Sequence, residues 1–498
     1  MKPVDKDLQR TFFGHPRGLA SLFFLELWER FSYYGMRALL ILFITSAAAG
    51  NNPGLALSIS EATAIYGLYT FFVYILALPG GWISDRLWGP RRAVFIGGCI
   101  IAAGHFTMAI PFVTAFYLGL GLVAVGTGLL KPCASSMVGD LYPEGGARRD
   151  AGYSLYYMGI NLGAILGPLF CGLLGEGYRW HLGFSLAGFG MAGGLISFRM
   201  GHHQLGDIGL MPREYSNSAA YIRLRNQFVQ GLAITTGLAV FTALLIYGGI
   251  LHISLTGLVS YLSYLTVIVT LLFFLYIIFL GGYDGGEIKK ILALLWLFIL
   301  AAVFWSGFEQ AGSSINLFAK ELTDRHILGI ELPASTLQLF NPLFIVIFAP
   351  VFGWLWTWLA YRQAHPSIAT KFSLGLFGLG AGFFVLSWGA ANASAANLVT
   401  PAWLMTTFFL HTCGELCLSP IGLSATTKLA PKNRMSQMMG IWFVSAALGN
   451  LIAGLLAGKL ETLPPSDLFR TIAWFACSAG VIALLASPWI KKLIKDVT

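Results

Sequence analysis

Long apolar runs recur along the whole of this 498-residue chain, and they constrain its fold more than any other feature. A helix that crosses a bilayer needs about 20 consecutive apolar residues. In hydrocarbon every backbone N–H and C=O must be paired within the protein, so only helices and closed barrels can span a membrane. The runs here are long and unbroken, unlike the short alternating segments of barrel strands. The sequence predicts fourteen membrane helices, near residues 19–48, 60–84, 92–111, 114–139, 149–175, 180–200, 229–250, 257–281, 290–318, 337–359, 370–390, 399–425, 436–458 and 470–489.

The composition excludes several other classes of protein. Only 11% of the residues are charged, against about 25% in soluble domains. The net charge of +9 sits in short loops between apolar runs and forms no basic stripe, so we expect no nucleic-acid partner. The six cysteines are scattered singly, which predicts neither a metal site nor a cofactor. Glu26, Glu29 and Arg30 lie in the first apolar segment, so we expect a retained helix and no cleaved signal peptide.

The distribution of basic residues predicts the orientation of the chain. Cytoplasmic loops of membrane proteins carry an excess of Lys and Arg. An even number of spans with both termini in the cytoplasm places most of the 31 basic residues inside, including Lys2, Lys6, Arg10, Arg213, Lys432 and Lys495. It leaves outside only Arg179, Lys320, Arg325, Lys459 and Arg470. The predicted location is a membrane, with lipid around the chain and both termini in the cytoplasm.

The seventh and eighth spans differ from the others. No Asp, Glu, Lys or Arg occurs between Arg225 and Asp284, so both helices can face lipid and are expected to form a peripheral hairpin. We therefore predict an all-α integral membrane fold with a six-helix bundle in 1–205, a linker and inserted hairpin in 206–285, and a second six-helix bundle in 286–498. Such a pair of bundles places a substrate site between them near the bilayer midplane.

Four charges in the first span need an explanation. A charge at the bilayer centre costs about 2.5–3.5 kcal/mol on insertion scales. At 100° per residue the charged positions and two tyrosines share one helical stripe, which consists of Glu26, Glu29, Arg30, Tyr33, Tyr34 and Arg37. We expect this face to line a hydrated cavity; the alternative is an ion-pair network that serves helix packing alone.

Three further charges lie inside spans. Lys131 lies in the fourth span, Glu309 in the span at 290–318 and Glu415 in the span at 399–425. Lys131 could instead snorkel to the cytoplasmic surface, and the two carboxylates could be bonded to neighbouring helices. The cavity charges of the first bundle sum to +1, and those of the second sum to −2. Opposed walls of this kind suit a zwitterion, and buried carboxylates beside cations can exchange protons.

Five motifs carry a resemblance to a known family. Residues 26–35 read ELWERFSYYG, and residues 81–86 read GWISDR with Arg91 and Arg92 after them. Residues 156–163 read YYMGINLG, residues 308–314 FEQAGSS, and residues 414–420 GELCLSP. The first of these resembles the ExxERFxYYG motif of the proton-dependent oligopeptide transporter family, and the second resembles the loop signature of the major facilitator superfamily. The remaining three resemble the fifth-, seventh- and tenth-helix motifs of the same transporter family.

The resemblance implies a major facilitator fold in a bacterial cytoplasmic (inner) membrane. It also implies a proton-coupled symporter that imports di- and tripeptides by alternating access, without a cofactor or catalytic residues. It implies proton coupling by Glu26, Glu29, Arg30, Lys131 and Glu309. It implies a gate salt bridge between Arg37 and Glu309. It implies peptide binding by Arg37, Tyr33, Tyr34, Tyr74, Lys131, Asn161, Trp305, Asn341, Glu415 and Trp442. Ordinary helix packing is the alternative role for each aromatic residue.

Three departures and several rival functions accompany the resemblance. Animal members of the family have a histidine where this chain has Gly67, so coupling here is expected to rest on carboxylates. Tyr156 stands where phenylalanine is usual, and Cys133 where asparagine is commoner. The same scaffold could carry nitrate, an amino acid or a peptide-like drug. A polytopic membrane enzyme is disfavoured because no nucleophile–base pair, metal cluster or phosphate loop is found, and a structural role would not retain seven costly charges.

Overall fold

The described chain is almost entirely helical. The structure, a computed structural model, describes residues 12–143, 146–211, 218–249, 251–327, 329–364, 366–431 and 434–493. The first half contains α1 (Gly18–Thr45), α2 (Ile59–Ile75), α3 (Ala77–Ile83), α4 (Pro90–Met108), α5 (Val113–Asp140), α6 (Gly146–Gly175) and α7 (Trp180–Gly201). Next come α9 (Ala219–Tyr247) and α10 (Leu255–Leu280). The second half contains α11 (Gly285–Phe308), α12 (Ser314–Glu321), α13 (Phe340–Tyr361), α14 (Ile368–Ala391), α15 (Ala402–Leu429), α16 (Met435–Gly458) and α17 (Pro465–Leu493). A two-stranded hairpin of β1 (His326–Ile327) and β2 (Ile330–Glu331) lies between α12 and α13.

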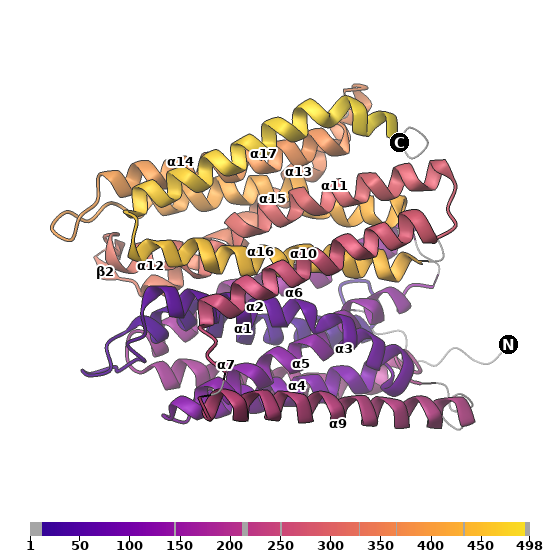
Figure 1. Ribbon diagram of the computed structural model, residues 1–498, viewed down its shortest axis with the longest axis horizontal. Helices are drawn as coiled ribbons and strands as arrows, with labels where there is room; N and C mark the ends of the chain where they lie inside the picture. Colours follow the sequence, from indigo (N-terminus) through magenta and orange to yellow (C-terminus); the bar gives the residue numbers. More distant parts are fainter. Residues whose placement is uncertain are drawn as a thin grey trace.

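The predicted all-helical membrane fold is confirmed. In the described residues ten helices are long and apolar enough to cross a membrane by length and composition alone. Four other long helices, α1, α4, α9 and α15, lie with their axes aligned with those of these ten (Figure 1). Helix α1 is a mostly buried helix of 28 residues, and its four charged residues, which are also buried, lower its apolar character.

Two predicted spans are interrupted, and one is longer than predicted. The span predicted at 290–318 breaks after Phe308, where a 3-10 turn over Glu309–Gly312 separates α11 from α12. The span predicted at 60–84 divides into α2, α3 and a π-helical turn over Ser84–Trp88. The first inserted helix begins ten residues before the predicted 229, because the polar segment with Arg223 and Arg225 is also helical.

The helices gather into two groups that follow the sequence. Helices α1, α4, α5, α6 and α7 pack against one another, and so do α11, α14, α15, α16 and α17. Figure 1 shows the earlier group below, in indigo and magenta, and the later group above, in orange and yellow. The two groups meet where α2 packs against α16 and where α6 packs against α13.

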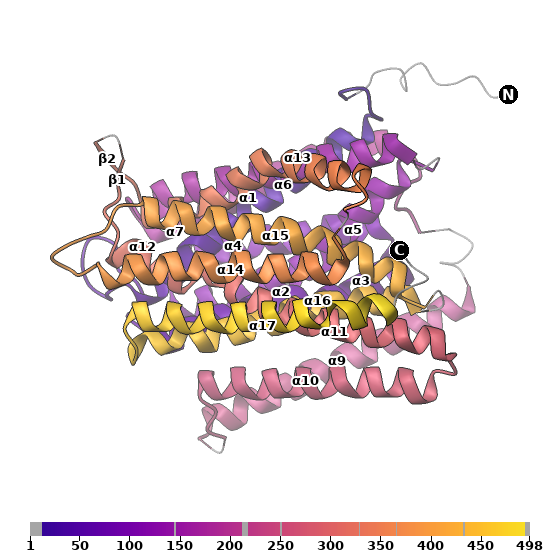
Figure 2. The same ribbon diagram turned by 90° about the horizontal axis from the view of Figure 1, so that it is seen from above.

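The two inserted helices lie at one edge of the molecule (Figure 2). Helix α10 packs against α2, α11 and α16, so it contacts both groups. Helix α9 contacts α3 and the π-helical turn after it. The Tyr221 hydroxyl donates to Leu87 O in that turn at 2.9 Å, and the Phe228 ring lies 6.0 Å from Trp82 of α3. Most described side chains of α9 are exposed, as expected for a helix that faces lipid.

The two ends of the molecule differ in content. The start of α1 and the end of α17 lie at one end, and β1, β2 and the loop after α14 lie at the other (Figure 1). The second end carries the basic residues predicted to lie outside, beside the start of α7 and the ends of α12 and α16. We call it the outer end. Lys2, Lys6, Arg10, Arg213, Lys432 and Lys495, which were assigned to the inside, lie outside the described residues.

Glycines allow very close contacts between α3 and α5. A Cβ added at Gly80 would lie 2.1 Å from Gly128 O, closer than any side chain can approach. The neighbouring Gly81 is different, since its Cβ would lie 3.7 Å from Pro132 Cβ, an ordinary contact. Small residues at helix interfaces let backbones approach closely inside a membrane. Gly80 therefore sets the distance between the two helices, whereas Gly81 does not.

We predict that Gly80→Ala lowers the apparent melting temperature of the detergent-purified protein, and that Gly81→Ala leaves it nearly unchanged. Inserting a methyl group into a packed interface costs about 1–3 kcal/mol. Thermal unfolding followed by tryptophan fluorescence measures both variants against the parent chain. Equal melting temperatures for the two variants would contradict the close α3–α5 contact.

Candidate functional site

An ion triad occupies the buried face of α1. Arg30 Nε lies 3.0 Å from Glu26 Oε1 and 2.5 Å from Glu29 Oε2. All three residues are buried, with exposed fractions of 5% for Glu26, 1% for Glu29 and 6% for Arg30. The triad carries two negative charges against one positive charge, so another cation or a proton must balance it at this depth.

Lys131 supplies positive charge near the triad. Its Nζ lies 3.8 Å from the ring centroid of Tyr74 on α2, and the side chain is half-buried. Coulomb interactions link Lys131 to Glu29 of the triad and to Glu309 of the second group. The ammonium thus packs against α2 between the two groups, and does not extend along α5 to the membrane surface.

A second buried ion pair joins the two groups of helices. Arg37 Nη2 on α1 donates to Glu309 Oε2, and Arg37 Nε donates to the Tyr66 hydroxyl on α2. Glu309 occupies the first position of the 3-10 turn that interrupts the predicted span. A Cβ at Gly312 in that turn would lie 1.9 Å from the Tyr66 hydroxyl. The break after α11 therefore brings the carboxylate and a bare glycine against α1 and α2.

The second group presents a polar cluster of its own. Asn341 Nδ2, at the start of α13, donates to Thr412 Oγ1 at 2.9 Å and to Glu415 Oε2 at 3.3 Å on α15. Asn341 and Glu415 are both half-buried, unlike the ion pair at Arg37. Tyr157 on α6, which interacts electrostatically with Glu415, is 42% exposed. The cluster is therefore less enclosed than the ion pair, as a ligand-binding role requires.

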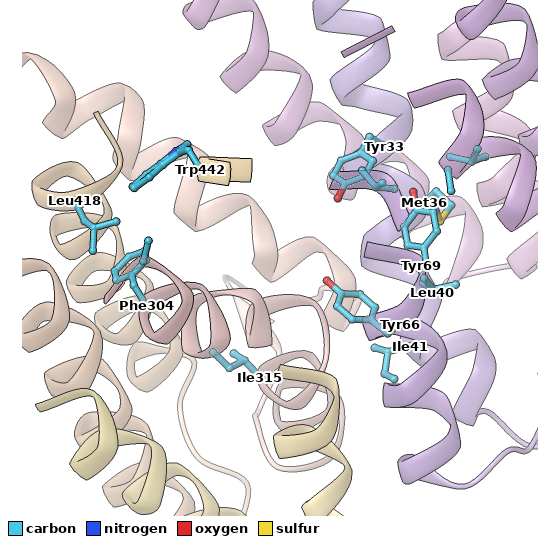
Figure 3. Close-up of a cluster of buried hydrophobic side chains, with 14 of the residues drawn as sticks. Tyr33, Met36, Leu40, Ile41, Tyr66, Tyr69, Phe304, Ile315, Leu418 and Trp442 are labelled. Atoms are coloured by element: carbon cyan, nitrogen blue, oxygen red, sulfur yellow. The ribbon is translucent and has the colours of Figure 1, made fainter. Parts of the chain in front are cut away.

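Aromatic side chains face one another across the boundary between the groups. Figure 3 shows Tyr33, Tyr66 and Tyr69 on one side, and Phe304 and Trp442 on the other. Tyr33 is stacked with Tyr69 at 6.4 Å between ring centroids. The Arg30 and Arg37 guanidinium groups lie 5.4 Å and 5.9 Å from the rings of Tyr33 and Tyr34.

The remaining predicted site residues differ in their accessibility. Tyr34, Tyr74 and Trp305 are half-buried, and Tyr33 and Trp442 are buried. Asn161 is also buried, and its Nδ2 donates to Tyr157 O at 2.9 Å, within its own helix. Its amide is thus already bonded to α6 and lies one turn from the exposed Tyr157.

Glu176, which follows α6, closes the outer end. Its Oε1 accepts from Ala334 N at 2.9 Å, and its Oε2 accepts from Ser335 N at 3.0 Å and from Ser335 Oγ at 2.9 Å. Arg325 Nη1 lies 3.5 Å from Oε1. A carboxylate from the first group thus caps the 3-10 turn Ala334–Leu339 of the second group.

Other hydrogen bonds join the groups at the same end. Asn316 Nδ2 on α12 donates to Ala38 O at 2.8 Å, and Lys320 Nζ donates to Ser46 Oγ at 3.0 Å. Ser60 N, at the start of α2, donates to Glu461 Oε1 at 3.1 Å. Together with the Arg37–Glu309 pair, these contacts hold the two groups together toward the outer end.

Three residues of this arrangement were not assigned a role from the sequence. Tyr156 on α6 donates its hydroxyl to Glu26 Oε2 at 2.6 Å, so the unusual tyrosine touches the triad directly. Tyr66 bonds to Arg37, and Glu176 closes the outer end. The departure from phenylalanine at Tyr156 was a usable signal. Tyr66 and Glu176 gave none, because one lies in an ordinary apolar run and the other in a loop.

Comparison with known proteins decides the family. The family model described as "POT family" matches residues 91–475, more than half of the chain. The chain belongs to the POT family. This confirms the resemblance inferred from the motifs, and it identifies the chain as a multi-pass membrane transporter and not an enzyme.

Individual POT-family relatives match over nearly their whole length. The peptide transporter YePEPT of Yersinia enterocolitica is 40% identical, over 98% of this chain and 97% of the relative. The di-/tripeptide transporter of Lactococcus lactis is 35% identical, over 98% of both chains. A crystal structure of a peptide transporter POT in complex with sulfate superimposes with a TM-score of 0.90 at 40% identity, covering 98% of this chain and 99% of that one.

We predict that Glu176→Gln favours opening of the outer end. The variant loses charge-assisted hydrogen bonds to Ser335 and Ala334, each worth about 1.5–3 kcal/mol, so the open population should rise at least about tenfold. Spin labels at Ala49→Cys and Ala396→Cys, in a background without the six native cysteines, measure the distance distribution across this end.

Glu331→Gln is the matched control for this measurement. Glu331 also bonds to Arg325, at 2.7 Å, but both residues lie in the second group. The control should keep the parent distribution. A Glu176→Gln sample without a longer-distance population would contradict the closing role of Glu176.

Proposed function

We propose that this POT-family chain imports di- and tripeptides together with protons by alternating access across a bacterial inner membrane, with both termini in the cytoplasm. The similarity to peptide transporters over the whole chain supports this proposal. A structure of a peptide transporter POT mutant in complex with alafosfalin superimposes on this chain with a TM-score of 0.88 at 40% identity. A related transporter thus binds a peptide-like ligand.

The observation that carries the proposal is the opposed charge of the two walls. Lys131 and Arg37 lie on the first group, and Glu415 with Asn341 lies on the second. A short peptide is a zwitterion, with an ammonium at one end and a carboxylate at the other. Its carboxylate would bind near Lys131 and Arg37, and its ammonium near Glu415, Asn341 and Asn161.

The aromatic lining accounts for tolerance of different side chains. Tyr34, Tyr74 and Trp305 are half-buried, so they can make contact with a ligand without deep rearrangement. Tyr33 and Trp442 lie behind, in the packed cluster of Figure 3. Aromatic rings supply large apolar contact area with a polar edge, which suits varied peptide side chains.

Proton coupling would act through the gate pair. Protonation of Glu309 removes the partner of Arg37, and breaking a buried ion pair costs about 3–5 kcal/mol. A shift of a two-state equilibrium from 1:99 to 99:1 takes about 5.5 kcal/mol. One proton therefore supplies a large part of the free energy needed to open the outer end. Glu26, Glu29, Arg30 and Lys131 form the second coupled set.

The moving parts would be the two bundles in 1–205 and 286–498, with 206–285 as the inserted segment. In transporters with this repeat architecture, one bundle rocks against the other around a central site. The outer contacts of Glu176 and Glu309 would break when the central site opens outward. The same scaffold carrying nitrate, an amino acid or a drug is the alternative. Competition by unlabelled tripeptides against labelled dialanine distinguishes these substrates, since Glu415 and Asn341 suit an ammonium.

We predict that proteoliposomes of this protein accumulate dialanine when an inward proton gradient is imposed, and that Glu309→Gln abolishes the accumulation. A glutamine cannot lose a proton, so the outer pair no longer responds to the gradient. Glu321→Gln, an exposed carboxylate on the adjoining α12, is the control and should accumulate normally. Normal accumulation by Glu309→Gln would remove that residue from the coupling mechanism. Absence of accumulation in the parent chain would remove symport altogether.

We also predict that Tyr156→Phe slows proton-driven dialanine uptake several-fold, whereas Tyr153→Phe leaves the uptake rate close to that of the parent chain. The first change removes the hydrogen bond that the Tyr156 hydroxyl donates to Glu26 Oε2, and a hydrogen bond to a charged group is worth about 1.5–3 kcal/mol. The triad is then held less firmly in its present geometry. Tyr153→Phe removes a hydroxyl from the same helix, where it donates to Ser135 O at 3.0 Å away from the triad. Equal uptake rates for the two variants would show that the Tyr156 hydroxyl does not support the triad.

A further inference from the structure

A pocket lined by basic residues lies on the outside of the first group, away from the boundary between the groups. It is formed where the start of α4 meets the end of α7, and its volume is about 220 Å³. Its lining includes Trp88, Arg91, Arg92, Phe95, Arg199 and His202. None of these residues takes part in the proposed transport of peptide or protons.

Arg91 is held rigidly at the base of this pocket. Its Nε donates to Ile208 O at 3.1 Å, and its Nη2 donates to Gly206 O at 2.7 Å and to Ile208 O at 2.6 Å. The backbone N–H of Arg91 also donates to Gly209 O at 3.0 Å. These bonds join the first turn of α4 and the segment after α7 into one wall. Arg91 would therefore lose little conformational entropy when a ligand binds.

The other two arginines are exposed at the rim. Arg92 lies with its guanidinium 6.0 Å from the ring of Trp88, and both Arg92 and Arg199 are exposed. Asp207 is the acidic residue that interacts with Arg91. Three arginines against one aspartate leave the pocket with an excess of positive charge. A site of this kind attracts anions.

The surroundings of the pocket are apolar and face outward. Phe95 on α4 is 39% exposed, and Ile196 and Met200 on α7 are 61% and 72% exposed. Trp88 lies where this apolar surface ends, the position that tryptophan prefers at a membrane–water interface. An anion that binds here would therefore lie at the level of lipid headgroups, beside acyl chains.

We propose that this pocket binds the phosphate of an anionic phospholipid, with the acyl chains along the exposed surface of α4 and α7. Guanidinium groups match phosphate oxygens through paired N–H donors. Basic pockets between membrane helices on the cytoplasmic side are typical sites for anionic headgroups. The pocket volume is below the range of about 300–1,000 Å³ found for pockets of drug-sized ligands. A small pocket suffices here because only the headgroup of the lipid would enter it. A lipid in this position would hold the segment 206–209 against α4, at the start of the connection to α9.

The test uses the full-length protein in detergent and native mass spectrometry, with phosphatidylglycerol and phosphatidylcholine as probes. The parent chain should bind phosphatidylglycerol more tightly than phosphatidylcholine. The double variant Arg92→Gln/Arg199→Gln should lose about tenfold or more in phosphatidylglycerol affinity, since each basic residue near a membrane surface contributes on the order of 1 kcal/mol. Its affinity for phosphatidylcholine should not change.

Arg362→Gln is the matched control. Arg362 also lies over a tryptophan, 4.6 Å from the ring of Trp358 at the end of α13, but outside the pocket. The proposal fails if this control loses as much affinity as the double variant, or if the double variant retains the parent affinity. It fails equally if inorganic phosphate displaces phosphatidylglycerol at equal concentration, because the site would then bind free phosphate. Arg92→Lys/Arg199→Lys replaces the glutamine variant if that one does not fold, and should lose affinity through its single-point donors.

Discussion

The ion pair between Arg37 and Glu309 is the interaction on which the closed arrangement depends. It joins the first helix to the second group at a depth where an unpaired charge is costly. Neither residue can remain ionised without the other or a substitute, so the state of this pair and the state of the outer end are linked. The hydrogen bonds of Glu176 and Asn316 then reinforce a closure that the ion pair makes possible.

The pair exists because a helix is interrupted. Helix α11 ends at Phe308, and the 3-10 turn that follows carries Glu309 toward α1. Gly312 lets the Tyr66 hydroxyl approach to a distance that any other residue would prevent. Interrupted helices at membrane depth are tolerated where the backbone is buried in protein or lines a cavity. The break is therefore a means of placing one carboxylate, and the neighbouring polar cluster at Asn341 and Glu415 stays accessible beside it.

Much of the fold followed from the apolar runs, and the exceptions have physical causes. Hydropathy located α5, α7 and α10 within a few residues, because their ends coincide with the ends of apolar character. It missed the break at Glu309, since a 3-10 turn changes the hydrogen bonding without changing the composition. It also placed the start of α9 too late, because a helix can continue beyond the bilayer into polar sequence.

The candidate site also divides into residues that the sequence marked and residues that only the structure revealed. Charges in apolar sequence marked Arg30, Arg37 and Glu309, because burial of an unpaired charge is too costly to occur without a reason. Their partners could not be read from the sequence in the same way. Tyr66 is an ordinary residue of an apolar helix, and the departure from phenylalanine at Tyr156 marked the position without naming its partner. Only the packing of α2 and α6 against α1 turns the two hydroxyl groups toward the charges. The roles proposed for the peptide-binding residues remain predictions.

Helix α10 touches both halves, and the chemistry of its buried stripe has a mechanical consequence. Ser263, Thr266 and Thr270 form the middle of that stripe. The hydroxyl groups of Ser263 and Thr266 donate back to their own helix, at 2.8 Å and 2.7 Å, so they offer no hydrogen bond that would pin α10 to α2 or α16. In this middle part of the stripe, small side chains whose donors are satisfied within α10 let neighbouring helices slide with little resistance. Helix α10 can thus remain in contact with both halves while the angle between them changes, without opposing that change.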